Sequence, residues 1–267
     1  MPVGTYKLAD VAVQITSVYD EVQTMCDSYR TDEEPQLFIS TTEADIRFEA
    51  QKSDEERREE GLPEYQYSAP YLETLAVYRQ LATQILSHNV LLVHGSVIAV
   101  DGEAYLFTAL SGTGKSTHVR LWRQLFGERG VMVNDDKPLI RVGGDLSSSD
   151  LSIANNSSLL TPHSSLKTSG TLVYGTPWDG KHHLSNNISV PLKAIIHLQR
   201  GAENHIEQIT PAEMLPILLQ QTFRPSTAQG TLQVMQLLDA LSKQVKFYSL
   251  HCNMEPEAAQ VAYEGMR

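Results

Sequence analysis

Near the middle of the chain, a glycine-rich stretch reads SGTGKST, and its residue types are those that hold phosphate groups. Gly112 and Gly114 let the backbone curl so that consecutive N–H groups point at phosphate oxygens, and a helix beginning after them adds the partial positive charge of its N-terminus. Lys115 supplies a cation for the β and γ phosphates, Ser116 a hydroxyl of the kind that ligates magnesium, and Thr117 a further hydroxyl. The stretch predicts that ATP or a similar nucleoside triphosphate binds with Mg²⁺ to Ser111, Gly112, Thr113, Gly114, Lys115, Ser116 and Thr117.

The segments on either side of this stretch are those that a phosphate-binding loop requires. A β-rich run at residues 103–108 leads into it, a helix follows with Val119 and Trp122 on its apolar face, and residues 131–133 form the next expected strand. Strand, loop, helix and strand in this order are typical of a P-loop. The pattern differs from GxxxxGKS/T at one position, because Ala109 stands where the first glycine is expected.

Two acids follow the strand expected at residues 131–133, in the order Asn134, Asp135 and Asp136. This places both carboxylates at the carboxyl end of a strand, where open α/β sheets bind ligands. One of them can hold magnesium or its water, and the other can receive the proton of a hydroxyl group. The alternative is an Asx turn with solvated acids.

Three further residues are candidates for work on phosphate. His94 ends the strand that precedes a hairpin, and it either faces the phosphate region or has a structural role. Arg141 and Arg224 either neutralise the charge of a transferring phosphate or form surface salt bridges.

A segment after the strand expected at residues 171–174 combines an aromatic side chain with a cation. Trp178, Asp179 and Lys181 surround a turn-forming Asp-Gly pair, and they either clamp nucleotide or substrate or form a simple hairpin turn. The adjacent histidines at residues 182–183 would point to opposite faces of a strand, so we expect exposed loop residues there rather than a metal site.

Composition limits the classes of protein to consider. Of 267 residues, 41% are hydrophobic and 20% are charged, which is ordinary for a soluble globular protein. The net charge of -11 repels polyanions and argues against a nucleic-acid partner. No apolar run is long enough for a bilayer and the start lacks the apolar stretch of a signal peptide, so we expect no membrane partner and a cytoplasmic location. Cys26 and Cys252 lie too far apart to indicate a zinc site or a disulfide framework.

The elements that must position these residues are read from hydrophobic periodicity and turn signals. Residues 1–65 are expected to form a small N-terminal α+β segment, and residues 66–267 the domain that carries the loop. Residues 143–170, rich in Gly, Ser, Asn and Asp, predict hairpins with long loops or a partly mobile insertion. The other expectations are an alternating strand pattern at 36–48, a helix at 71–86 with a left-handed cap at Asn89, strands at 90–100, 171–174, 192–198 and 245–250, a hairpin at Asp101 and Gly102, and helices from Thr210, at 232–241 and from 256.

The chain resembles the HPr kinase/phosphorylase group in three motifs that occur in the same order. They are His94 with Gly95, ALSGTGKS at residues 109–116, and Asn134-Asp135-Asp136. That group shares its nucleotide core with ATP-dependent phosphoenolpyruvate carboxykinase. The resemblance implies an α/β fold with a P-loop core and a mixed sheet. It also implies that Lys115 contacts phosphates, that Ser116 and Asp136 bind magnesium, and that Asp135 activates the acceptor, although the sequence leaves the roles of the two acids open. With Asp135 and Lys115, His94 completes the expected catalytic set.

The glycine-rich signature with which HPr kinases bind and dephosphorylate HPr is absent, and residues 175–181 differ from it. The chain looks more like the shorter HPr-kinase-like proteins of ribosomal peptide pathways, some of which phosphorylate a serine of a precursor peptide. We therefore expect an ATP- and magnesium-dependent phosphotransferase that modifies a hydroxyl, with serine favoured, of a peptide, protein or small molecule. A nucleotide-sensing regulatory protein and a carboxykinase-like enzyme are the alternatives, and self-association into a homo-oligomer stays open.

Overall fold

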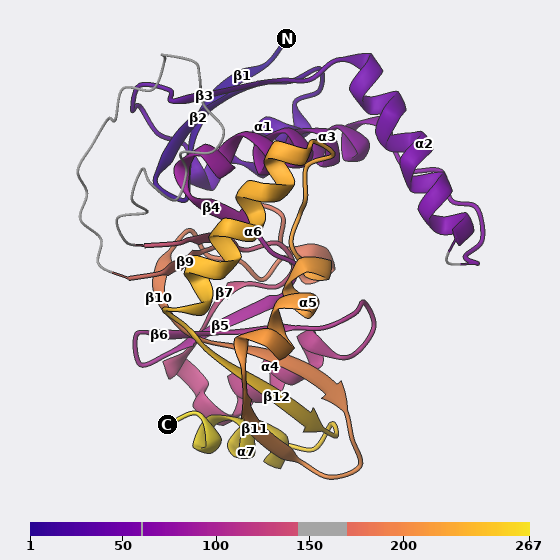
Figure 1. Ribbon diagram of the computed structural model, residues 1–267. Helices are drawn as coiled ribbons and strands as arrows, with labels where there is room; N and C mark the ends of the chain where they lie inside the picture. Colours follow the sequence, from indigo (N-terminus) through magenta and orange to yellow (C-terminus); the bar gives the residue numbers. More distant parts are fainter. Residues whose placement is uncertain (60, 144–169) are drawn as a thin grey trace. The chain divides into compact units, whose positions relative to one another are not determined.

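The computed structural model describes residues 1–59, 61–143 and 170–267, so the expectation for residues 143–170 falls almost wholly outside the described residues. The chain is a mixed α/β protein and divides into two compact units, Met1–Ser87 and His88–Arg267 (Figure 1). Each unit has a sheet of its own. No helix in the described part of the chain is long and apolar enough to cross a membrane.

The N-terminal unit is built on a three-stranded sheet in the order β1-β2-β3. β1 and β2 are antiparallel, and β2 and β3 are parallel. The elements of the unit are β1 (Val3–Leu8), β2 (Val11–Thr16), α1 (Glu21–Met25), η1 (Asp27–Tyr29), β3 (Leu37–Ser40), α2 (Glu43–Glu59) and α3 (Ala69–Gln84). The short helix η2 (Ile85–His88) spans the boundary between the two units.

Helix α3 belongs to this unit, although the sequence favours a boundary at residue 65. Its Glu73 is fully buried, and the Glu73 carboxylate accepts hydrogen bonds from the backbone N–H groups of Val18 and Tyr19 at 2.6 and 2.8 Å. The hydroxyl of Thr41 donates to the same carboxylate. Because a buried carboxylate needs such partners, α3 is tied to the N-terminal sheet and the compact unit extends to Ser87.

The alternating strand pattern expected at residues 36–48 is wrong beyond Ser40. Helix α2 begins at Glu43, where the hydroxyl and the N–H of Thr42 both bond the carboxylate of Asp45, at 2.7 and 3.0 Å. This helix-start signal overrides the local alternation. The charged residues at 53–59 lie on the same helix.

The C-terminal unit contains a nine-stranded sheet within the described residues, in the order β4-β8-β9-β10-β6-β5-β7, and β12 pairs with β10 and β11. The sheet is mixed, because β10 runs parallel to β6 and β12 whereas β5 is antiparallel to β6 and β7. Its strands are β4 (Val90–Leu92), β5 (Ser96–Val100), β6 (Glu103–Thr108), β7 (Gly130–Asn134), β8 (Leu139–Arg141), β9 (Leu172–Tyr174), β10 (Ser189–Arg200), β11 (His205–Ile209) and β12 (Lys246–Cys252).

Turn residues fix the start of this unit as the sequence predicts. Asn89, with φ of 59°, takes the left-handed conformation just before β4, and Asp101 and Gly102, with φ of 53° and 83°, form the turn between β5 and β6. Positive φ at both central residues is the requirement of a type I′ hairpin turn. The hairpin therefore delivers β6 into the glycine-rich loop.

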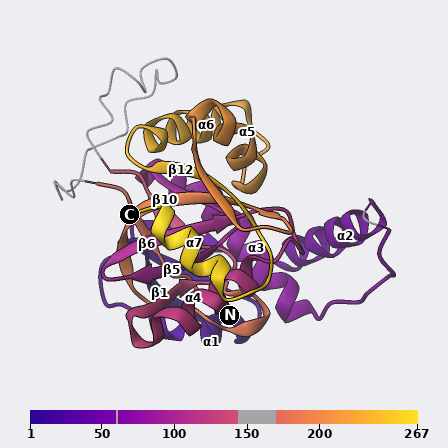
Figure 2. The same cartoon turned by 90° about the horizontal axis from the view of Figure 1, so that it is seen from below.

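Helices cover both faces of the large sheet. Helix α4 (Lys115–Phe126) contacts α7 (Glu257–Gly265) and strands β5, β6 and β7. In Figure 2 the strands lie between α4 and the pair formed by α5 (Pro211–Gln221) and α6 (Ala228–Ser242). The short helices η3 (Gly127–Arg129) and η4 (Gly180–His182) complete the unit. The core under α4 and α7 includes Ile98, Tyr105, Phe107, Val119, Trp122, Ile196, Leu250 and Ala262.

Candidate active site

The glycine-rich loop connects the end of β6 to the first residue of α4. Gly112 and Gly114 have φ of 76° and 122°, a region that residues with a Cβ rarely adopt. Ala109 does not take a positive φ, and its side chain is buried in the core beneath α4. The position where P-loops carry their first glycine therefore tolerates alanine here, because its backbone does not need the freedom of glycine.

Lys115 is a buried cation, with only 8% of the residue exposed. Its Nζ donates to the carbonyl oxygens of Ala109 at 3.0 Å and Leu110 at 3.3 Å. Burial lowers the pKa of the amine, and no carboxylate of the described residues lies within 4.0 Å of it. A buried ammonium without a close counter-ion favours an incoming anion.

Arg200, at the end of β10, holds the outer side of the loop. Its guanidinium donates to the carbonyl oxygens of Gly112 at 2.6 Å and Thr113 at 3.2 Å. Two loop carbonyls are therefore turned toward Arg200. No local sequence pattern predicts this contact beyond the place of Arg200 at a strand end, because the residues are far apart in the chain.

The buried Asn134, the last residue of β7, positions the two acids. Its side-chain oxygen accepts from the N–H groups of Asp136 at 2.9 Å and Lys137 at 2.7 Å, and its amide donates to both oxygens of Thr176 at 3.1 Å. The Asx turn named above as the alternative is present. It does not leave both acids in solvent, because Asp135 is only 8% exposed.

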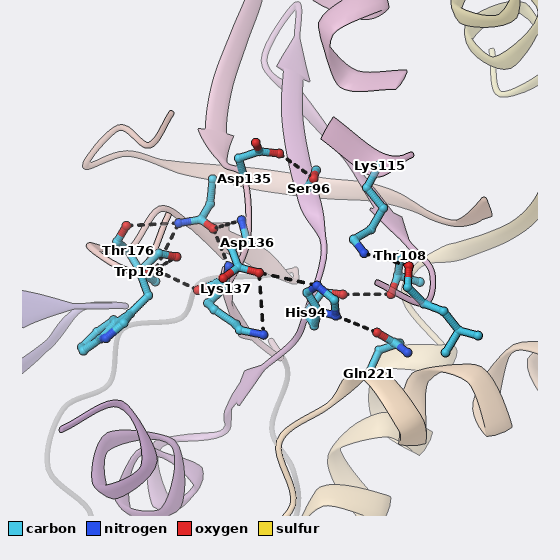
Figure 3. Close-up of polar contacts among 12 residues, drawn as sticks. His94, Ser96, Thr108, Lys115, Asp135, Asp136, Lys137, Thr176, Trp178 and Gln221 are labelled. Carbon is cyan, nitrogen blue, oxygen red and sulfur yellow. Dashed lines mark hydrogen bonds and ion pairs between the residues drawn. The ribbon is translucent and has the colours of Figure 1, made fainter. Parts of the chain in front are cut away.

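The carboxylates of the two acids point in different directions (Figure 3). Asp135 accepts from the hydroxyl of Ser96 at 2.7 Å. Asp136 faces Nε2 of His94 at 3.5 Å and Nζ of Lys137 at 3.7 Å. Burial raises the pKa of Asp136, against the opposing effect of the nearby lysines.

His94 is held by three parts of the fold. Its N–H donates to the carbonyl oxygen of Gln221 at 2.7 Å, and its carbonyl accepts from the hydroxyl of Thr108 at 2.9 Å. Its Nδ1 lies 2.9 Å from Oε1 of Gln221, an oxygen that only accepts, so Nδ1 carries the proton and Nε2 presents a lone pair toward Asp136. Burial, with Lys137 and Lys115 nearby, lowers the pKa of His94 to about 3, so the ring is neutral near pH 7.

One cavity of about 510 Å³, the loop cavity, joins these groups. It is lined by His94, Ser111, Gly112, Gly114, Lys115, Ser116, Thr117, Asp135, Asp136, Gly180, Lys181 and His182. Gly180 closes the cavity near the acids, because a Cβ at this position would lie 3.3 Å from that of Asp136. The loop cavity therefore brings together all the residues that the sequence favours for phosphate binding and catalysis except Thr113, which does not line it. Lys181, a candidate for substrate or phosphate binding, lines it as well.

Four other candidates do not line the loop cavity. Trp178 is buried, and its carbonyl accepts from the N–H of Lys137 at 3.2 Å. Asp179 bonds Nδ1 of His183 at 3.1 Å and the hydroxyl of Ser185 at 2.9 Å. Arg141 donates to the carbonyl of His88 at 3.1 Å. Arg224 is exposed just beyond α5.

Several residues of the site were missed by sequence reasoning. Ser96, Lys137 and Gln221 contact the candidate residues directly. His182 was expected in an exposed loop; it is exposed, but it lines the loop cavity. Ser96 and Lys137 stand next to motif residues in the sequence, whereas Gln221 comes from a distant helix and carries no local signal.

Among the described residues, no group of three or more acidic, histidine or cysteine side chains could hold a metal ion by itself. Magnesium does not need one, because it is usually bound through one or two carboxylates together with the phosphates of the substrate. Ser116 and Asp135 or Asp136 fit that requirement in the loop cavity. No known family model matches this chain, and no curated protein matches it.

Proposed function

We propose that the chain is an ATP- and magnesium-dependent phosphotransferase that transfers the γ-phosphate to a hydroxyl group, with an HPr-kinase-like P-loop core. The single observation that carries the proposal is the buried Lys115, hydrogen-bonded at the head of a loop with two glycines of positive φ and facing a cavity that also contains two acids. A buried cation and a glycine-rich loop at the N-terminus of a helix suit the β and γ phosphates.

The contacts of the acids favour different roles for them. Asp136 is the acid that faces His94, and Lys115 interacts more strongly with Asp136 than with Asp135. Its raised pKa also suits a group that must take a proton near neutral pH. We therefore favour Asp136 as the general base and Asp135 as the magnesium ligand, the reverse of the assignment that the family resemblance implies.

In the transfer step, the hydroxyl oxygen of the acceptor forms a bond to the γ phosphorus while the bond from that phosphorus to the β–γ bridging oxygen breaks. The electron pair of the broken bond leaves on ADP, and the hydroxyl proton passes to Asp136. Lys115 and the loop N–H groups stabilise the charge on the phosphates. Magnesium, held by Ser116 and Asp135, would neutralise part of the same charge.

Neutral His94 assists the base after the proton has moved. Its Nδ1 bonds Gln221, so the lone pair of Nε2 can accept a hydrogen bond from the Asp136 carboxyl once that group is protonated. Since His94 does not take a positive charge near pH 7, it does not compete with Lys115 as the partner of Asp136.

The proposal is tested by incubating the full chain with γ-labelled ATP, Mg²⁺ and a set of serine-containing peptides and hydroxyl metabolites. We expect ADP and a labelled acceptor in equal amounts. The rate should fall as the pH decreases through the raised pKa of Asp136, because the base must be unprotonated to accept the proton. ATP binding without transfer to any acceptor would instead support a nucleotide-sensing protein.

A further inference from the structure

A second cavity of about 480 Å³, the arginine cavity, adjoins the loop cavity along helix α4. The two cavities share Ser116, Thr117, Asp135 and His182 in their linings. Nothing in the proposed transfer step uses the remainder of this space.

The remaining lining has a cationic wall and an apolar floor. Arg120 and Arg123 form the wall, and Val119, Met132 and Leu184 the floor. Both arginines are exposed, and neither has a carboxylate partner among the residues that the structure describes. Two arginines without partners outweigh the single carboxylate of Asp135. The cavity is therefore suited to an anion with an apolar part, although the net charge of the chain is -11.

The spacing of the arginines sets the size of the ligand. They follow Ser116 by four and seven residues on one helix, so they lie about 6 and 10 Å farther along its axis, at 1.5 Å per residue. An extended peptide covers about 3.3 Å per residue. An acidic side chain two or three residues from an acceptor serine would therefore reach the arginines.

Asp135 identifies which end of the triphosphate lies next to the arginine cavity. The acids lie where the γ-phosphate is transferred, and the nucleoside lies at the other end of the phosphate chain. Because Asp135 lines both cavities, the arginine cavity opens at the transfer end. An acceptor approaches from this end, whereas the base of the nucleotide does not.

We propose that the arginine cavity binds an acidic side chain of a peptide acceptor, two or three residues from the serine that receives the phosphate. The inference rests on the proposed phosphotransferase function and adds the class of substrate. Arg120 and Arg123 form charge-assisted hydrogen bonds with the carboxylate. The apolar floor covers the carbon atoms next to it.

Small hydroxy acids are the other source of a hydroxyl with a carboxylate. In glycerate or free serine, the two groups are only a few bonds apart and do not span the distance to the arginines. The peptide is therefore the favoured source, and the small acids form a separate arm of the test.

The test measures kcat/KM with γ-labelled ATP and short peptides that contain one central serine. Residues two and three positions from the serine are glutamate, alanine or lysine in three parallel peptides, and glycerate and free serine are assayed separately. Wild-type protein should prefer the glutamate peptide to the alanine peptide by about tenfold or more, as expected for charge-assisted hydrogen bonds. The Arg120→Glu, Arg123→Glu double variant should lose that preference and favour the lysine peptide.

A matched control carries the same change of charge. In the Lys246→Glu, Arg267→Glu double variant, both altered residues are exposed and line neither cavity, so it should keep the wild-type preference. Release of ADP without an acceptor and the KM for ATP should be unchanged in both double variants.

Three results would overturn the inference while ATP binding by the wild-type protein stays intact. They are equal rates with all three peptides, transfer to the small hydroxy acids alone, and a raised KM for ATP in the Arg120→Glu, Arg123→Glu variant, which would make the cavity a nucleoside site. Failure of the underlying function is a different outcome, since wild-type protein would then either show no binding of ATP with Mg²⁺ by calorimetry or bind ATP without transfer to any acceptor.

Discussion

Helix α4 has two sides that differ in what they contact. On one side, Ser116, Arg120 and Arg123 face cavities. On the other, His118 and Trp122 are buried in the core shared with β6 and α7. Both sides come from one stretch of twelve residues, so position in the sequence alone does not separate binding residues from packing residues.

Two histidines, His118 on this helix and His94 near it, show what separates binding residues from packing residues. Burial lowers the pKa of His118 to about 4 and, with the nearby lysines, that of His94 to about 3, so both rings are neutral near pH 7. His118 accepts from the indole N–H of Trp122 at 3.0 Å and lies 3.7 Å from the sulfur of Cys252. His94 presents Nε2 to Asp136 beside a cavity. A shifted pKa marks both sites, but only charged neighbours at a cavity indicate chemistry.

The largest expected effect separates binding from chemistry on the cavity side. Asp136→Asn keeps the size of the side chain and removes the base, so transfer should fall by about 10² to 10⁴ while ATP still binds. Asp135→Asn should instead weaken the magnesium-dependent part of ATP affinity. Single-turnover transfer, and ATP affinity with and without Mg²⁺, distinguish the two variants.

Swapped phenotypes would restore Asp135 as the base and leave the phosphotransferase intact. Near-normal transfer in both variants would reject the mechanism. Ser96→Ala is a useful companion, because it removes the hydrogen bond to Asp135 without altering either acid.

On the packing side, Trp122→Ala should lower the free energy of unfolding by about 3 to 5 kcal/mol, the usual cost of removing a large buried aromatic. The Trp122 ring is fully buried and contacts the rings of Tyr105 and Phe107 at centroid distances of 5.0 and 5.3 Å. Urea unfolding measures the change. Leu125→Ala on the same helix is the control, because Leu125 is 45% exposed and its loss should cost far less. Equal losses in the two variants would show that the buried side of α4 does not carry the packing.

The smallest effect is expected from Ala109→Gly, at the head of the loop. The backbone there does not require a glycine, and the Lys115 contact uses the carbonyl, which the substitution retains. ATP affinity should change by less than about tenfold, or roughly 1.4 kcal/mol. Calorimetry with ATP and Mg²⁺ measures it, and complete loss of binding would mean that the Ala109 methyl shapes the loop.

Local signals predicted much of the fold. The helix expected from Thr210 begins there as α5, because Thr210 and Glu213 form a capping box with the Glu213 carboxylate 2.8 Å from the N–H of Thr210. The hairpin at Asp101 and Gly102 also matches its sequence signal. Such features depend on a few adjacent residues and on backbone preferences that each residue carries itself.

Strands β8 and β11 were not predicted. β8 has three residues, too few to show a period. β11 has two isoleucines separated by polar residues and no fully buried position, so it lacks the apolar alternation of a core strand. Each is defined by its pairing partners, β4 and β9 for β8, and β12 for β11.

For the candidate site, the sequence indicated the loop and the acids because each is a contiguous motif. The contacts of Arg200 with the loop and of Gln221 with His94 join residues 87 or more positions apart, and no local pattern encodes them. Trp178 shows the converse, since an aromatic beside a cation suggested a clamp but the side chain is buried.

The central claim is that Lys115 and its loop bind the phosphates of ATP, and calorimetry of ATP with Mg²⁺ on wild-type protein and Lys115→Ala tests it most directly. The fold should survive the substitution, because the amine is a buried cation without a carboxylate within 4.0 Å among the described residues. Lys246→Ala, an exposed lysine outside both cavities, serves as the control. We predict tight binding by wild type and control, and its loss in Lys115→Ala with an unchanged circular dichroism spectrum. Unchanged ATP affinity in a folded Lys115→Ala variant would contradict the claim.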